Sequence, residues 1–120
     1  MVSKRILVVD DSPIILATAK HVLVAAGFTV ETSGSVEEVA AHGADGYELI
    51  LMDVQMPELF GDDVAAVLRH ERDVPAKIFL FSTLPDAELR ERAADAKLDG
   101  FISKDLGPEH LVSEVRRILA

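Results

Sequence analysis

The sequence predicts a doubly wound α/β domain, in which helices cover both faces of a parallel β-sheet. Short apolar runs of the kind found in buried parallel strands recur along the chain, and stretches with helical spacing of apolar residues separate them. Five strand-then-helix repeats of roughly 20 to 25 residues each favour right-handed crossovers. The 120 residues fit one compact domain, so we expect residues 1–120 to form a single unit without a second, effector domain.

The first repeat combines a buried strand with a well-capped helix. The run 6–9 is β-branched and apolar, and it ends in Asp10 and Asp11. Ser12 is a suitable N-cap with Pro13 at the first helical position, and the helix should end at Gly27. Its apolar face is predicted to consist of Ile15, Ala19, Val22, Leu23 and Ala26.

The second and third repeats follow the same pattern. Residues 28–31 can form a second strand, and Ser35 with Glu38 predicts a capping box at the start of a short helix. That helix would carry Val36, Val39 and Ala40. A third buried strand, 49–52, ends in Asp53, and the loop after it is marked by Pro57 and Gly61 before a helix with Val64, Ala65 and Leu68 on one face.

The last two repeats end their strands in hydroxyl and lysine side chains. The strand 78–81 leads into Ser82 and Thr83, and the strand 101–102 leads into Ser103 and Lys104. A helix from 85–86 carries a thin apolar face, and a final helix starts at Pro108. The apolar positions are Leu89, Ala93 and Ala96 in the first of these helices and Leu111, Val115, Ile118 and Leu119 in the second.

Composition excludes several classes of function. The chain has 49% apolar and 28% charged residues, which is typical of a soluble globular protein. Without cysteine it has no disulfides, thiolate metal site or cysteine nucleophile. We find no apolar run long enough for a membrane span and no signal peptide, so a cytoplasmic location is expected. A net charge of −9 argues against direct nucleic-acid binding.

Polar residues follow four of the predicted strands, and they predict a metal-assisted site. In an open α/β sheet the functional crevice lies beyond the carboxyl ends of the strands, so Asp10, Asp11, Asp53 and Lys104 should converge with a hydroxyl from 82–83. Three neighbouring carboxylates would raise one another's pKa unless a cation neutralises them. Oxygen ligands favour Mg²⁺, with Mn²⁺ as a substitute. A carboxylate can then act as a phosphoryl acceptor while the lysine and hydroxyl stabilise the phosphoryl oxygens.

These residues resemble the receiver domain of two-component response regulators. The resemblance rests on Asp10-Asp11, the run 51–57 with Gly61, the hydroxyls after the fourth strand, and the run 101–104, and it spans essentially the whole chain. It implies a CheY-like, flavodoxin-like (βα)5 three-layer fold with strand order 2-1-3-4-5. It also implies that Asp53 accepts the phosphoryl group, that Lys104 pairs with it, and that Mg²⁺ is held by Asp10, Asp11, Asp53 and the backbone carbonyl of Gln55.

The resemblance also implies a switch. The family's spacing of hydroxyl to lysine favours Ser82 over Thr83, and Phe101 stands where the family has an aromatic residue that turns inward. Gln55 and Leu84 would flank the phosphoryl group and influence its lifetime. A sensor histidine kinase or a histidine phosphotransfer protein would load Asp53, and output would go through a downstream protein target, with phosphorylation-dependent homodimerisation left open. The chain would not be an enzyme beyond its own phosphotransfer and autodephosphorylation.

Two other functions compete with the switch. The first is a receiver-fold binding module that works without phosphorylation, and the second is an aspartyl-phosphate phosphatase similar to the haloacid dehalogenases. The phosphatase is disfavoured because position 55 is Gln, so no second carboxylate follows Asp53 at the spacing of a general acid.

Several residues depart from the family pattern or receive no role. Asp105 replaces the proline that usually follows the lysine, and Lys97 replaces a usual glycine, so the loop after the fifth strand and the choice of partner could differ. The four histidines lack metal-ligand spacing and are expected to lie at or near the surface without a function. They are His21, His42, His70 and His110.

Overall fold

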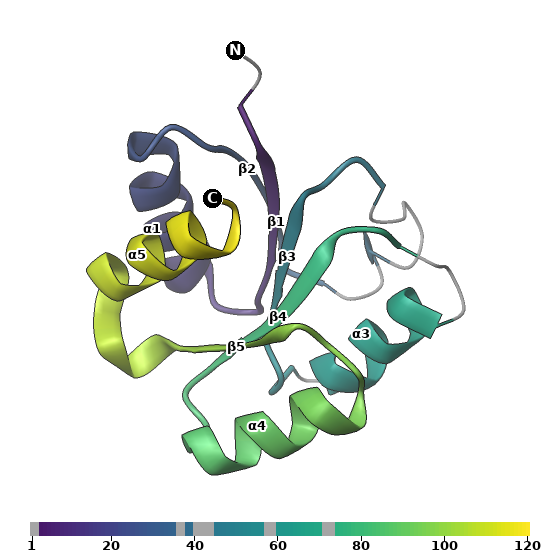
Figure 1. Ribbon diagram of the computed structural model, residues 1–120. Coiled ribbons are helices and arrows are strands. Elements are labelled where there is room, and N and C mark those ends of the chain that lie inside the picture. Colours follow the sequence, from purple (N-terminus) through teal and green to yellow (C-terminus); the bar gives the residue numbers. More distant parts are fainter. Residues whose placement is uncertain (1–2, 36–37, 40–44, 57–59, 71–73) are drawn as a thin grey trace.

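The computed structural model describes residues 3–35, 38–39, 45–56, 60–70 and 74–120. Strands and helices alternate along the chain (Figure 1). The strands are β1 (Arg5–Val9), β2 (Thr29–Ser33), β3 (Leu49–Met52), β4 (Lys77–Ser82) and β5 (Gly100–Ser103). The helices are α1 (Pro13–Ala25), α3 (Gly61–His70), α4 (Asp86–Asp95) and α5 (Gly107–Ile118), and a 3₁₀ turn, η1, covers Lys104–Leu106.

The sheet has the predicted parallel order, β2-β1-β3-β4-β5. Helices α1 and α5 lie on one face of the sheet, and α3 and α4 lie on the other (Figure 1). The layers and the strand order confirm the doubly wound, flavodoxin-like fold. This arrangement places the carboxyl ends of all five strands along one edge.

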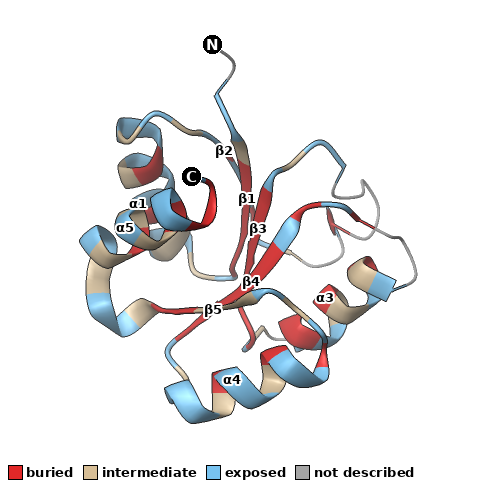
Figure 2. Cartoon of the chain, in the orientation of Figure 1, coloured by how far each residue is buried: buried red, intermediate tan, exposed pale blue. Residues whose placement is uncertain are grey.

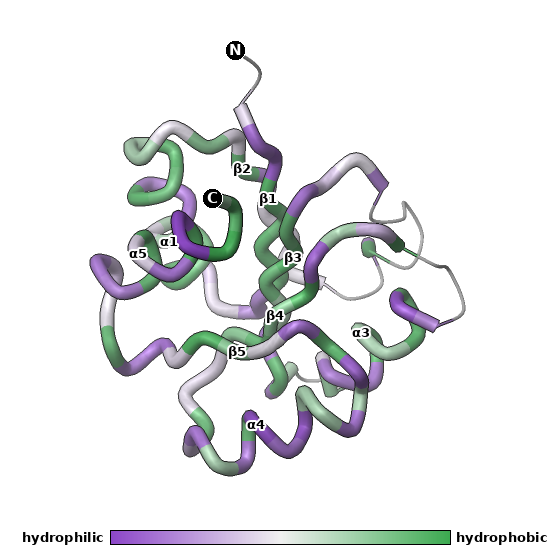
Figure 3. Tube along the Cα trace, in the orientation of Figure 1, coloured by the Kyte–Doolittle hydropathy of each residue, from purple (hydrophilic) through white to green (hydrophobic). Residues whose placement is uncertain are grey.

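The central strands are buried on both faces, as their uninterrupted apolar sequences predicted. Figures 2 and 3 show that β1, β3 and β4 are largely buried and largely hydrophobic. Side chains alternate between two cores, so that Ile6 and Val8 pack towards α1 and α5 while Leu7 and Val9 pack towards α3. Packing on both faces of the sheet therefore fixes the positions of the strand ends, which carry the polar residues.

Helix α1 has the predicted N-terminus and ends at Ala25 with Ala26 as its C-cap, directly before the predicted Gly27. The Ser12 hydroxyl accepts a hydrogen bond from the Ile15 amide at 3.3 Å, and Pro13 is the first helical residue. At the other end, Gly27 has φ +102°, and the Phe28 amide donates to the Leu23 carbonyl. Phe28 therefore closes the helix, and β2 runs from Thr29 to Ser33 instead of from 28 to 31.

Helix α4 ends with the same type of cap, although no glycine is present. Lys97 has φ +56°, its amide donates to the Ala94 carbonyl, and the Leu98 amide donates to the Ala93 carbonyl. These two bonds form a Schellman motif, which needs a left-handed residue at the position of Lys97. The structure thus gives a physical reason for the glycine that the family resemblance implies here.

The segment after β5 contains the substitution of Asp105 for proline. Its peptide bond with Lys104 is trans, and the Asp105 amide donates to the Ser103 hydroxyl at 3.2 Å. Ser103 therefore caps η1, which leads directly into α5. The loop after β5 is thus a short 3₁₀ turn with only trans peptide bonds.

Some sequence predictions fall outside the described residues. They concern Val36, Ala40, His42 and Pro57. Within the described part of the chain, residues 38–39 are helical, and the Glu38 carboxylate accepts a hydrogen bond from the Ser33 hydroxyl at 2.9 Å. None of the helices in this part combines the length and apolar character that crossing a membrane requires.

Candidate functional site

The register between β1 and β3 brings Asp10 and Asp53 together. Val9 of β1 pairs with Met52 of β3, so Asp10 and Asp53 follow their strands at the same level of the sheet. The Asp53 amide donates to the Val9 carbonyl at 2.9 Å, which extends the strand pairing by one residue. The local backbone therefore fixes both carboxylates at the carboxyl edge.

Three carboxylates form a cluster that could hold a metal ion. One oxygen from each of Asp10, Asp11 and Asp53 lies within 4.8 Å of the others. Asp10 and Asp53 are buried, whereas Asp11 is exposed to solvent. An all-oxygen, partly open donor set of this kind suits a hard divalent cation that keeps some of its water ligands.

Lys104 connects this cluster to β5. Its ammonium lies 2.5 Å from Asp10 Oδ2 and 3.2 Å from Asp53 Oδ1. The side chain is 10% exposed and also approaches the face of the Phe81 ring, at 5.4 Å from the centroid. The sequence predicted the position of Lys104, but not its direct contact with both buried carboxylates.

Burial is the main reason why Asp53 is hard to ionise. Removal from water raises the pKa of its carboxyl to about 6; nearby Lys104 acts in the opposite direction, and Asp10 raises it further. The sequence predicted a raised pKa from repulsion among the carboxylates. Desolvation contributes more than that repulsion, because the residue is only 4% exposed.

Backbone contacts around Asp53 explain the glycine of the following loop. A Cβ atom on Gly61 would lie 1.6 Å from the Asp53 carbonyl oxygen, so no larger residue fits without a shift of the backbone. The Gly61 amide donates to the Val54 carbonyl at 2.9 Å, and Phe60 pairs with Gln55 in an isolated antiparallel bridge. The start of α3 thus packs directly on the segment from Asp53 to Gln55.

The two candidate hydroxyls have different environments. Ser82 is fully buried, and its hydroxyl accepts a hydrogen bond from the Leu84 amide at 3.2 Å, whereas Thr83 is exposed. Ser82 pairs in register with Ser103, the residue before Lys104. Ser82 therefore lies buried at the carboxyl end of β4, whereas Thr83 points into solvent-exposed surroundings.

Phe101 is half-buried at the edge of a small core that contains Val54, Leu80 and Leu89. The Arg90 guanidinium lies over its ring at 5.6 Å from the centroid. Its ring is therefore neither fully enclosed nor free in solvent.

One residue that the sequence did not assign to the site also contributes to it. Ser12, assigned only as a helix cap, also donates its amide to Asp10 Oδ1 at 2.9 Å and so orients that carboxylate. Histidines take no part in the carboxylate cluster in the described ranges. His70 contacts the Ala96 carbonyl instead, with its Nε2 at 3.2 Å.

A family model described as the response regulator receiver domain matches residues 6–116. The chain belongs to this family. Among curated proteins, this receiver is 37% identical over 117 residues to a gliding motility regulatory protein of Myxococcus xanthus, with 95% of this chain and 15% of that protein covered. It is 32% identical to the probable transcriptional regulator ycf27 of Cyanophora paradoxa, with 97% and 48% covered. The receiver therefore spans about half or less of these relatives.

Solved structures agree with the fold. A CheY-like receiver domain protein from Methanospirillum hungatei superposes with a TM-score of 0.86 at 26% identity, covering 98% of this receiver and 94% of that chain. The response regulator TrrA from Thermotoga maritima, solved in complex with Mg²⁺–BeF, gives a TM-score of 0.80 at 30% identity, covering 96% and 98%. Both matches extend over nearly the full receiver.

Proposed function

We propose that this receiver is a phosphorylation-driven switch in which Asp53 accepts a phosphoryl group with the help of Mg²⁺. The observation that carries the proposal is the cluster itself, where the buried Asp53 carboxylate lies beside Asp10, Asp11 and the ammonium of Lys104. This combination of a nucleophilic carboxylate, metal-binding oxygens and a cation is what phosphoryl transfer requires.

Asp10, Asp11, Asp53 and the carbonyl of Gln55 would hold the ion. Bound Mg²⁺ would neutralise charge that develops on the phosphoryl oxygens, and Mn²⁺ can replace it. The complex of TrrA with Mg²⁺–BeF supports this assignment, because that protein is similar over almost the whole receiver.

The protein residues divide the remaining tasks. An Asp53 oxygen attacks the phosphorus of a phosphohistidine on a histidine kinase or phosphotransfer protein, the P–N bond breaks, and the departing imidazole takes a proton from water. Lys104 moves from the carboxylates to pair with the phosphoryl oxygens, and the Ser82 hydroxyl donates to one of them. The site needs no other general acid from the chain.

Output would follow from a population shift. Ser82, at the end of β4, and Phe101, in β5, would change position when Asp53 is loaded, and this would alter the surface seen by a downstream protein. The receiver matches only part of its curated relatives. A downstream protein partner, phosphorylation-dependent homodimerisation and a cytoplasmic setting are therefore parts of the same proposal.

Incorporation from a small acyl phosphate tests the proposal without a kinase. Wild-type protein with Mg²⁺ should gain one phosphoryl group by intact mass, and the gain should disappear with EDTA or in Asp53→Asn. Asp45→Asn is a matched control because Asp45 is exposed, before the amino-terminal end of β3, and that variant should label normally. Equal labelling of wild type and Asp53→Asn would contradict the assignment.

The two competing functions give different results in the same assay. A phosphatase would turn over a phosphomonoester continuously, which we do not expect because Gln55 offers no carboxylate. A module that works without phosphorylation would incorporate nothing, and beryllofluoride with Mg²⁺ would leave the amide spectra of Ser82 and Phe101 unchanged.

A further inference from the structure

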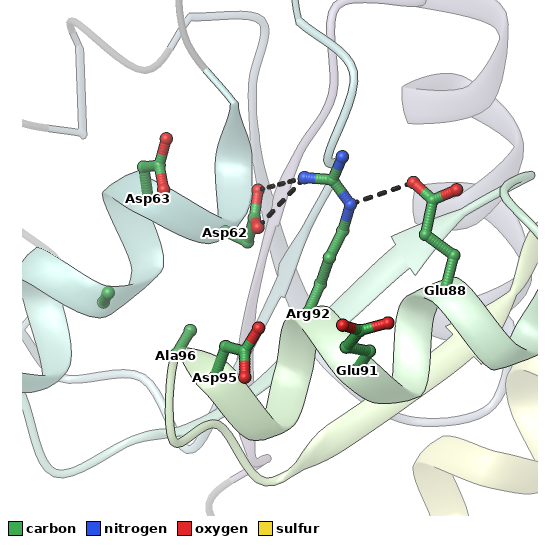
Figure 4. A pocket seen from close by; sticks show the side chains of 8 residues that line it. Asp62, Asp63, Glu88, Glu91, Arg92, Asp95 and Ala96 are labelled. Carbon is green, nitrogen blue, oxygen red and sulfur yellow. Dashed lines mark hydrogen bonds and ion pairs between the residues drawn. The ribbon is translucent and has the colours of Figure 1, made fainter.

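A groove of about 480 Å³ separates α3 from α4, and Arg92 lies in it among carboxylates. Figure 4 shows Arg92 rising from α4 towards Asp62 at the start of α3, with Glu88 on the other side of its guanidinium. Further acidic side chains, Asp63, Glu91 and Asp95, line the groove. Arg92 is thus a cation from one helix that reaches an anion on the other.

The contacts of Arg92 are directional and partly shielded from water. Its Nη1 lies 3.1 Å from Asp62 Oδ2 and 3.3 Å from Oδ1, and its Nε donates to Glu88 at 3.0 Å. The guanidinium also lies over the Phe60 ring, at 5.3 Å from the centroid. Because the Asp62 side chain is only 12% exposed, solvent screens this pair less than a surface ion pair.

The residues that Arg92 contacts lie next to the segment from Asp53 to Gln55. Phe60 pairs with Gln55, and Gly61, which lies between Phe60 and Asp62, donates to the Val54 carbonyl. Gly61 also packs so closely on the Asp53 carbonyl that a displacement of one would displace the other. A continuous set of contacts therefore runs from Arg92 on α4 to the backbone of Asp53 and Gln55.

We propose that Arg92 is a positioning residue for the phosphoryl site. It holds Asp62 and Phe60 from α4, and thereby fixes the Asp53 carboxylate and the Gln55 carbonyl in the geometry that binds the metal ion. This inference rests on the proposed function. Helix α4 follows the Ser82 end of β4. The contacts of Arg92 therefore connect the segment after Asp53 to the helix that follows the Ser82 hydroxyl. Such coupling is reciprocal, so loading of the site should also bias α4.

Arg92→Ala tests this role through two measurements. One is the Kd for Mg²⁺, from titration of the amide resonances of Gln55 and Gly61, and the other is the rate of labelling by a small acyl phosphate at saturating Mg²⁺. We expect a Kd weaker by about three- to tenfold and a slower rate, because outer-shell contacts orient metal ligands. Arg92→Lys should recover only part of the loss, since an ammonium cannot reproduce the two-sided contact of a guanidinium.

Arg69→Ala is the matched control. Arg69 anchors the opposite end of α3 through Asp99, so its loss should lower stability without changing the Kd for Mg²⁺. In an Asp62→Asn background, Arg92→Ala should have a smaller effect on the Kd than in wild type.

An unchanged Kd and labelling rate in Arg92→Ala would overturn the inference, as would an equal change of the Kd in Arg69→Ala. If Arg92→Ala does not fold, Arg92→Lys and Asp62→Asn decide by the same Kd comparison. If wild type binds Mg²⁺ but takes up no phosphoryl group, the proposed function fails, while the Mg²⁺ titration still decides the role of Arg92.

Discussion

Asp53 combines burial with a charge, and the two act against each other. The surrounding strands exclude water from its carboxylate, while Lys104 contributes a compensating cation at 3.2 Å. The raised pKa shows that this compensation is incomplete. A divalent ion would complete it, so the electrostatics of one residue already favour a metal-loaded state.

The metal-free protein should be more stable when Asp53 is replaced by Asn. The folded-state pKa of about 6 lies above the ordinary 3.8, so folding favours the protonated carboxyl. The stability lost by ionising it grows as the pH rises from about 4 to 6 and is fully present above pH 6. Asp53→Asn should therefore gain about 1 to 3 kcal/mol at pH 7 in EDTA. The gain should shrink as the pH falls through 6 and vanish near 4, as measured by urea unfolding at each pH.

A difference in free energy of unfolding between wild type and Asp53→Asn that stayed constant from pH 7 to pH 4 would contradict this explanation. Asp45→Asn, which removes an exposed carboxylate, should follow the wild-type profile.

The helix ends show where local sequence signals succeed and where they fail. Ser12 and Pro13 predicted the start of α1, because capping depends on residues adjacent in the sequence. The end of α1 was predicted to within one residue, but β2 was placed too early, since Phe28 satisfies a carbonyl of the helix. At Lys97 the residue type gave no sign of a left-handed conformation, and only the family resemblance pointed to one.

Lys97→Gly should stabilise the protein. A non-glycine residue at φ +56° is strained, and glycine removes this strain at the Schellman cap of α4. We expect a gain of about 1 kcal/mol in the free energy of unfolding, measured by thermal or urea denaturation. Lys97→Ala is the control, because it removes the same charge but keeps the Cβ atom. Equal stability of the two variants would show that the backbone conformation is not the cause.

The whole molecule brings together residues that are far apart in the chain. The family resemblance implied the strand order, and the parallel sheet predicted that Asp10, Asp53 and Lys104 would meet, because parallel strands end at one edge. The sequence could not reveal that Lys104 bridges both carboxylates, that Gly61 packs on the Asp53 backbone, or that Arg92 reaches across to α3. These contacts depend on side-chain packing between elements, which has no periodic signature.

Mg²⁺ should stabilise the folded protein as a whole, because the three carboxylates converge only when β1 and β3 are paired. At about 100 times its Kd, the ion should add about 2.7 kcal/mol to the free energy of unfolding. Asp11→Asn is a suitable variant because Asp11 is exposed, so its loss should weaken the effect without disturbing the core. Thermal unfolding with and without Mg²⁺ measures the stabilisation of wild type and of Asp11→Asn. An identical Tm for wild type in Mg²⁺ and in EDTA would show that the folded protein does not bind the ion.

The most direct measurement is the chemical location of the phosphoryl group. Wild-type protein is labelled with a small acyl phosphate and Mg²⁺, reduced with borohydride to convert an aspartyl phosphate to homoserine, digested, and mapped by mass spectrometry. We expect homoserine at position 53 and none at positions 10 or 11. Reduction at another aspartate, or a phosphoryl group on Ser82 or a histidine, would contradict it.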